Sequence, residues 1–254
     1  GNCGSALSYE LLEQYGQAYI DYQRMLQKEV GIELAGKALV RLGTQLGYRD
    51  EAARWVERFG PDPERPEGAA SVVVLAGVGL GPFKREITLP VPTGDGLLQW
   101  SVPDFERRPQ AVSNLVLRSV GLGSVETSVI EDVAVVSEQN LSDRIGWLAA
   151  RSAVRAVMKR ELTQHLEKKY DAAGQVAGDV FTLFTERADL RAWQTLPDTW
   201  QAARLWVAPG RHELALEAVG GPAQIPGTFE LEAGETVIVL ARVVRGQVYA
   251  PPVR

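Results

Sequence analysis

The sequence predicts an α+β protein in which amino-terminal helical hairpins precede a mixed domain of strands and one long helix. Residues 1–60 show helical periodicity, whereas much of the later chain alternates apolar and polar residues as strands do. Between these regions, Gly60–Gly68 holds three prolines and two glycines, which stop a helix and favour an extended connection. We therefore expect hairpins at 1–60, a linker at 61–69 and an α+β domain at 70–254.

Composition and charge limit the classes of partner. Of the 254 residues, 45% are hydrophobic and 23% are charged, as in ordinary folded proteins. The net charge of −5 disfavours nucleic-acid binding, which usually depends on an excess of basic residues. No apolar run approaches the roughly 18–20 residues needed to span a bilayer. We expect no nucleic-acid partner, and a membrane connection only through a lipid anchor.

The first sixty residues divide into two pairs of helical segments, Ala6–Gln27 and Leu34–Phe59, each with a turn near its middle. The stretch Gln14–Ala18 resembles the turn and second-helix start of a tetratricopeptide repeat, and Gly47–Ala52 repeats that pattern. Ala18 and Ala52 lie 34 residues apart, which is the period of this repeat. Small residues are needed there because the paired helices cross closely. Two unrelated amphipathic hairpins remain the alternative.

Repeats of this kind present a concave surface to peptides, so the hairpins are the candidate partner-binding region. Tyr9, Tyr15 and Tyr22 stand at packing positions of the first unit and are the candidate partner-binding residues. Repeat units bury their faces only against neighbours. Two units therefore imply either that further repeats precede Gly1 or that these two dock on the following domain.

The later chain contains segments typical of short antiparallel strands with one covered face, separated by glycine and proline turns. The segment around Pro209-Gly210 resembles the strand–turn–strand of small β-sandwich modules, and we expect a β-sandwich-like part at 203–250. The expected strands are Ser71–Val78, Lys84–Leu89, Leu97–Val102, Asn114–Val120, Thr127–Val136, Arg204–Val207, Glu213–Val219, Thr228–Leu231 and Thr236–Val244.

Leu141–Tyr170 is the longest helical pattern and contains no proline. Asn140 or Ser142 is expected to cap it. Its alanine-rich face predicts close packing on a sheet. The opposite side carries a cationic stripe, formed by Arg144, Arg151, Arg155 and Lys159. This stripe is a candidate anion-binding site, although a solvated helix face is the commoner meaning of such a pattern.

No catalytic constellation is evident in the sequence. Glu131 and Asp132 fall on a predicted strand, where neighbouring side chains point to opposite faces. His165 and His212 lack the companion ligands of a zinc site and are expected to be structural. We predict neither a metal site nor a cofactor. Trp193 and Trp200 are expected to seal a core.

Cys3 is the single cysteine, so no internal disulfide can form. It stands within Gly1-Asn2-Cys3-Gly4-Ser5, which is similar to the lipidated start of mature bacterial lipoproteins. Cys3 is therefore a candidate lipidation site, with an incidental thiol as the alternative.

The order of segments resembles an uncharacterised family of proteobacterial envelope lipoproteins. The resemblance rests on helical repeats followed by Val73–Pro92, a helix over Val133–Lys169, and Ala188–Pro197 leading into Pro209–His212. It implies a periplasmic protein tethered to the outer membrane, near the machinery of peptidoglycan synthesis. It supplies no catalytic residues.

We expect a non-enzymatic scaffold of the cell envelope that binds a protein partner through its repeats. A hydrolase or transferase acting on cell-wall material, and an oligomeric structural subunit, are the alternatives.

Overall fold

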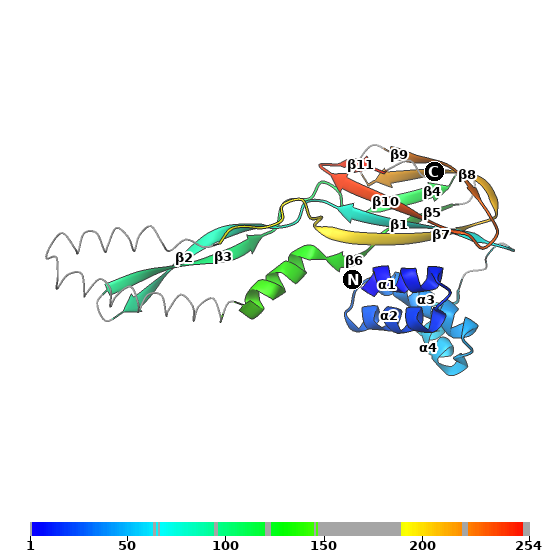
Figure 1. Cartoon of the computed structure of the whole chain (residues 1–254), viewed down its shortest axis with the longest axis horizontal. Helices are drawn as coiled ribbons and strands as arrows, with labels where there is room; N and C mark the ends of the chain where they lie inside the picture. Colours follow the sequence, from blue (N-terminus) through cyan, green and yellow to red (C-terminus); the bar gives the residue numbers. More distant parts are fainter. Residues whose placement is uncertain are drawn as a thin grey trace. The chain divides into compact units, whose positions relative to one another are not determined.

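The computed structural model describes residues 2–62, 65, 67–93, 96–119, 123–144, 146, 189–219 and 223–250 (Figure 1). The chain forms two compact units. The first comprises Gly1–Gly81, Pro109–Val133 and Thr195–Arg254, and the second comprises Pro82–Arg108 and Ala134–Gln194. No helix among the described residues is long and apolar enough to cross a membrane.

The first unit begins with four helices packed as two hairpins, which confirms the helical prediction. The turns follow Leu11 and Gln45 and close in the same way. Gln14 N–H donates to the Tyr9 carbonyl and Tyr48 N–H to that of Gly43, both at 2.8 Å. These bonds are offset by the same 34 residues that relate Ala18 to Ala52. The helices are α1 (Asn2–Leu11), α2 (Tyr15–Gln27), α3 (Ile32–Gln45) and α4 (Arg49–Phe59).

Small residues allow the second hairpin to pack closely, as predicted. Ala18 and Ala52 are both buried. A Cβ atom at Gly43 would lie 3.3 Å from the Ala52 Cβ, closer than most side-chain contacts. Across the hairpins, Trp55 Nε1 donates to the Tyr19 hydroxyl at 2.9 Å, and that hydroxyl donates to Glu51 at 2.6 Å.

Strands from two parts of the sequence, residues 70–132 and 199–249, form two sheets in the first unit. The five-stranded sheet has the order β11-β10-β1-β7-β6, and the four-stranded sheet has the order β5-β4-β8-β9. The strands are β1 (Ala70–Val78), β4 (Leu115–Ser119), β5 (Gly123–Glu126), β6 (Ser128–Asp132), β7 (Thr199–Val207), β8 (Gly210–Ala218), β9 (Ala223–Leu231), β10 (Thr236–Val244) and β11 (Gln247–Tyr249).

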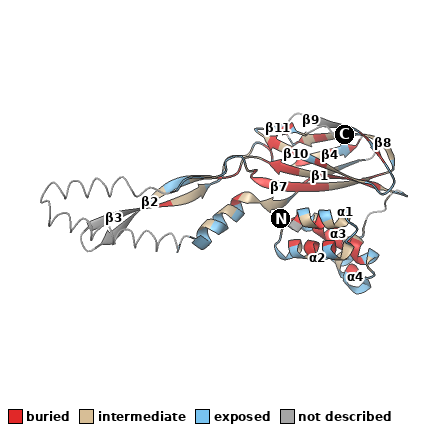
Figure 2. Cartoon of the chain, viewed as in Figure 1, coloured by how far each residue is buried: buried red, intermediate tan, exposed pale blue. Residues whose placement is uncertain are grey.

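The unit has three layers, because one face of the five-stranded sheet packs on the other sheet and part of the opposite face is covered by the helices (Figure 1). In β1, Val72 and Val74 belong to the core between the sheets, whereas Val73 belongs to the core beneath the helices. Burial on both faces explains the unbroken valine run of this strand, which Figure 2 shows as buried along its length.

The sandwich differs from the expected carboxy-terminal module in its strand order. β1 runs parallel to β10, with Ser71 opposite Thr236 and Val78 opposite Val243. It is antiparallel to β7 on its other side. The four-stranded sheet likewise joins β4 to β8. The sandwich-like part therefore extends beyond residues 203–250, and the expectation of purely antiparallel pairing is wrong for β1 and β10.

The helices also connect to the sheet at its β6 edge. Gly31 adopts a left-handed conformation with φ 55° just before α3, and its N–H donates to the Val129 carbonyl at 2.9 Å. A Cβ atom at Gly31 would lie 3.0 Å from the Ile130 side chain. Glycine thus satisfies both the backbone conformation and the close approach.

The predicted strand Thr127–Val136 is wrong over its last four residues, because β6 ends at Asp132 and residues 133–144 are helical. Its partner β7 begins at Thr199, and Val133 N–H donates to the Asp198 carbonyl at 2.9 Å. After Asp132, therefore, β7 has no further residue with which β6 could pair.

This early start overturns the expected caps at Asn140 and Ser142, which lie inside the helix. Asn140 Nδ2 donates to the Val136 carbonyl one turn back, at 2.9 Å. Of the predicted helix Leu141–Tyr170, residues 141–144 and 146 are described and helical; the remainder lies outside the described residues.

The second unit contains an antiparallel ribbon of β2 (Phe83–Thr93) and β3 (Gly96–Glu106). Arg85 on β2 pairs with Asp104 at 3.2 Å and with Glu106 at 3.1 Å on β3. Both strands are longer than predicted.

The tryptophans predicted to seal a core are exposed. Trp193 is 72% exposed in the second unit and Trp200 is 38% exposed in the first. Trp200 sits on β7 with the same orientation as Ala202, but nearer the start of the strand, where a groove rather than the helices lies over the sheet.

Candidate functional site

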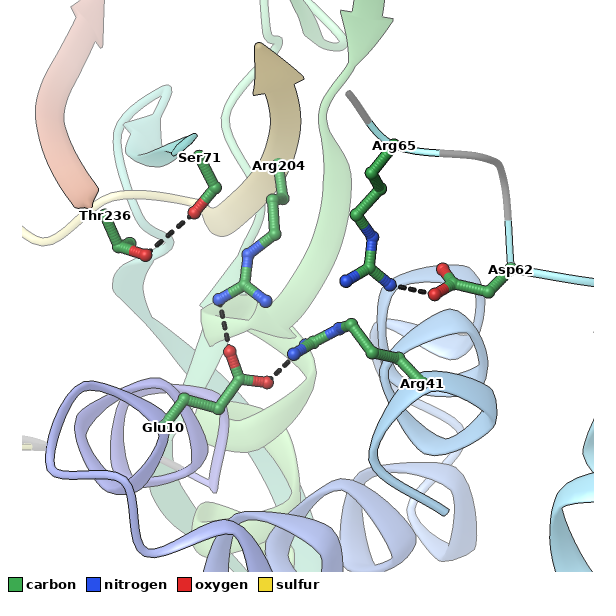
Figure 3. A network of polar contacts seen from close by, with 7 residues as sticks. All are labelled: Glu10, Arg41, Asp62, Arg65, Ser71, Arg204 and Thr236. Atoms are coloured by element: carbon green, nitrogen blue, oxygen red, sulfur yellow. Dashed lines mark hydrogen bonds and ion pairs between the residues drawn. The ribbon is translucent and has the colours of Figure 1, made fainter. Parts of the chain in front are cut away.

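A buried ion network joins the hairpins to the five-stranded sheet (Figure 3). Glu10, in the last turn of α1, accepts from Arg41 of α3 and from Arg204 of β7, both at 2.5 Å. The side chains of Glu10 and Arg204 are only 8% and 9% exposed. One carboxylate thus connects two helices with a central strand.

Burial alone would raise the pKa of Glu10. The positive charges of Arg204 and Arg41, and the hydrogen bonds that both donate, outweigh burial and hold this pKa below its usual value. Glu10 is therefore ionised in the folded protein at neutral pH.

A third guanidinium, that of Arg65, completes a cluster around the Trp206 ring. The guanidinium carbons of Arg65, Arg204 and Arg41 lie 4.3, 5.4 and 5.5 Å from the ring centroid. Arg65 also pairs with Asp62. Such distances allow cation–π attraction, which partly offsets repulsion among the three cations. We call Arg41, Arg65, Arg204 and Trp206 the arginine cluster.

A pocket of about 390 Å³ lies beside this cluster, between α3 and the sheet. Helix α3 contributes Glu33, Leu34, Lys37, Ala38 and Arg41, and β7 contributes Ala202, Ala203, Arg204 and Trp206. The pocket is also lined by Tyr22, Asp62, Ser124, Val125, Glu126 and Ser128. It combines apolar walls with charged groups, as small-molecule sites do.

Sequence reasoning missed this site. Arg41 interrupts the apolar run Ala38–Leu42, and Arg204 interrupts the apolar strand Ala202–Val207. A single charged residue within an apolar run indicates that its side chain has a buried partner. Nothing in the sequence spacing identifies Glu10 as that partner.

The hairpins turn α1 and α3 toward the sheet, while α2 and α4 lie on the other side (Figure 1). Of the predicted partner-binding residues, Tyr22 is 1% exposed and belongs to the core with Met25 and Leu39. Tyr9 and Tyr15 are half-buried and pack on that core. These three tyrosines pack within the helical layer rather than standing free at its surface.

Cys3 is 4% exposed and lies inside α1, packed in the helical core. Burial raises the pKa of its thiol to about 12. A lipid on Sγ would require the first turn of α1 to leave this core. Lipidation at Cys3 stays a prediction, which the mass of the natural mature protein tests.

Folded protein is expected to react slowly with a thiol reagent at pH 8, because the thiol of Cys3 is both buried and protonated. Denatured protein should react at the rate of a free cysteine. Because Cys3 is the single cysteine, the colour released by an aromatic disulfide reagent measures this residue alone. Equal rates in the two states would contradict the burial of the thiol.

The other predicted sites lie partly outside the described residues. Arg144 is exposed on the helix 133–144, and Arg151, Arg155 and Lys159 lie outside the described residues. The His212 ring lies 2.7 Å from the Ala208 carbonyl, which suits a structural role. His165 also lies outside the described residues. Within the described ranges, no group of three or more histidines, cysteines or carboxylates is arranged to hold a metal.

The described fold defines an α+β protein whose helical hairpins, similar to tetratricopeptide repeats, dock on a β-sandwich. No protein-family model and no solved structure matches the chain. A stretch of 61 residues is 43% identical to Sperm-associated antigen 1 of Homo sapiens and covers 24% of this chain. The mouse protein matches equally, and the rat protein is 38% identical over 61 residues. The matched stretch spans only 6–7% of these relatives.

Proposed function

We propose that this protein is a non-enzymatic scaffold that binds a protein partner through the outer side of its helical hairpins. The observation that carries this proposal is the pair of hairpins with a common 34-residue offset and the same turn geometry. The similarity to a protein that contains tetratricopeptide repeats supports it. Repeats of this kind serve in protein binding.

The side formed by α2 and α4 is the partner surface that we propose. The side formed by α1 and α3 packs on the protein's own sheet. The side formed by α2 and α4 retains exposed apolar groups, including Ile20 at 41% and Val56 at 36%. Tyr48, at the start of α4, is 46% exposed. These are residue types that partners bury at interfaces.

For the setting of this scaffold we propose the bacterial cell envelope, with the protein periplasmic and tethered to the outer membrane. This part of the proposal rests on the resemblance to envelope lipoproteins. The machinery of peptidoglycan synthesis is the partner class that the resemblance implies. Fractionation of the source bacterium, with an antibody against this chain, tests the location: recovery in the cytoplasmic fraction would overturn it.

Deleting the hairpins is a poor test of partner binding, because it would expose the sheet face that they cover. The sharper test changes Ile20 and Val56 together to glutamate. Cross-linking in envelope extracts, followed by affinity measurement with the recovered protein, should show binding weakened about tenfold or more, because two charges enter an apolar interface.

Val219→Glu is the matched control, since Val219 is 47% exposed at the end of β8, in the layer away from the helices. It should bind like the unchanged protein. Equal binding by the Ile20/Val56 variant, or recovery of no partner, would count against the proposal. Turnover of purified peptidoglycan would favour a hydrolase or transferase instead, and symmetric assemblies in sizing experiments would favour a structural subunit.

A further inference from the structure

The arginine cluster places three positive charges around one buried ring. Among the described residues, the carboxylates bonded to it are Glu10, shared by Arg41 and Arg204, and Asp62, paired with Arg65 (Figure 3). Three guanidinium groups therefore share two carboxylates. Burial, followed by the charges of Arg41 and Arg204, lowers the pKa of Arg65 to about 10. The cluster is one negative charge short of local balance.

Two of these guanidinium groups carry an N–H donor that has no acceptor within the described part of the chain. Nε of Arg204 and Nε of Arg65 are buried, and neither has a hydrogen-bond partner among the residues that the structure describes. The Arg204 side chain is 9% exposed, so bulk water reaches it poorly. A buried N–H without an acceptor costs free energy, and an oxyanion is the acceptor that guanidinium groups bind best.

The adjacent pocket, at about 390 Å³, has room for a compact molecule and is lined by Arg41, Arg204 and Lys37. Three carboxylates also line it. Glu33 is paired with Lys37, Asp62 is paired with Arg65, and Glu126 is exposed to solvent. A carboxylate that is paired with a cation or exposed to solvent repels an incoming anion less than a buried, unpaired carboxylate would.

We propose that this pocket binds a small molecule through an oxyanion group, either a phosphate or a carboxylate. The planar guanidinium groups present paired N–H donors that match the oxygens of both groups. Trp206, Leu34 and Ala38 supply apolar surface for the remainder of the ligand. The site lies between the hairpins and the sheet, so occupancy would add a link between these layers without covering the outer sides of α2 and α4.

The test is calorimetric titration of the full chain with sodium phosphate and, separately, with sodium succinate. Sodium chloride keeps the ionic strength constant, because salt screens charge interactions. At least one of the two anions should bind with a dissociation constant of about 1 mM or lower. Binding of phosphate alone identifies a phosphate-bearing ligand, and binding of succinate alone identifies a carboxylate.

Arg65→Gln removes one cation of the cluster without touching the Glu10 network and should weaken binding about tenfold or more. Arg118→Gln is the matched control, since Arg118 is 55% exposed and pairs with Glu217 on the four-stranded sheet. Lys37→Gln, at a half-exposed residue of the pocket wall, gives an independent second variant. The proposal is overturned if neither anion binds at about 10 mM, or if Arg65→Gln and Lys37→Gln both bind as tightly as the control.

Discussion

Replacing Glu10 by glutamine is expected to lower the free energy of unfolding by about 3–5 kcal/mol. The reason is the burial of its partners: Arg204 is 9% exposed and Arg41 is 12% exposed. Without the carboxylate, two guanidinium groups remain in a poorly solvated place with no negative charge between them. Urea unfolding followed by circular dichroism measures the effect.

The matched control is Glu33→Gln, because Glu33 pairs with Lys37 on the same helical layer but is 71% exposed. Loss of this exposed pair should cost less than about 1 kcal/mol. A similar small loss for Glu10→Gln would show that the network does not hold the hairpins to the sheet. Arg204→Met, combined with Glu10→Gln, should recover part of the lost stability, since it removes one of the stranded charges.

Glu10 also predicts how stability depends on pH. Its pKa in the folded protein lies below the reference value of 4.5 for an unpaired glutamate. At low pH the unfolded chain therefore takes up a proton more readily than the folded protein does, and unfolding is favoured. The stabilisation by Glu10 is complete above pH 4.5 and is lost as the pH falls through the folded pKa. The stability difference between unchanged protein and Glu10→Gln should shrink over that range; a constant difference would contradict this assignment.

Replacing Gln201 by leucine is expected to cost about 1–3 kcal/mol, because the buried Thr127 hydroxyl and the Ser113 carbonyl each lose a hydrogen bond. Gln201 is 1% exposed on β7. Its Nε2 donates to the Ser113 carbonyl at 2.7 Å, and its Oε1 accepts from the Thr127 hydroxyl at 2.6 Å. These bonds tie the five-stranded sheet to the segments that flank β4 and β5.

Gln247→Leu provides the comparison for this change. Gln247 is exposed on β11 and accepts from the Tyr249 hydroxyl at the surface. The same substitution there should alter stability by less than about 0.5 kcal/mol. If the two leucine variants unfold at the same denaturant concentration, the buried amide has no special role and the cost assigned to its partners is wrong.

The hairpins were predictable because their information is local. The apolar positions of α3, such as Ala35, Leu39 and Leu42, recur at helical spacing. The two turns share one hydrogen-bond geometry at a 34-residue offset. For the same reason β10 was predicted at Thr236–Val244, the bounds that it has in the structure. Neighbouring residues suffice to specify such elements.

Predictions failed where a distant partner decides the conformation. Val133–Val136 continues an apolar strand pattern, but it is helical because the β7 ladder ends at Thr199. Trp200 has the size of a core residue, yet it lies on a part of the sheet bordered by a groove. The composition of a segment does not reveal which of its faces another element covers.

The sequence by itself determined the helical hairpins, the positions of most strands and the α+β class, since periodicity, turns and small residues act over a few neighbouring positions. The tertiary structure alone decided that β1 runs parallel to β10 and that α1 and α3 face the sheet. It also brought Glu10 to Arg204, and three guanidinium groups to Trp206. Ion pairs and pockets depend on distances between segments far apart in the chain, and those distances are set only when all the layers pack together.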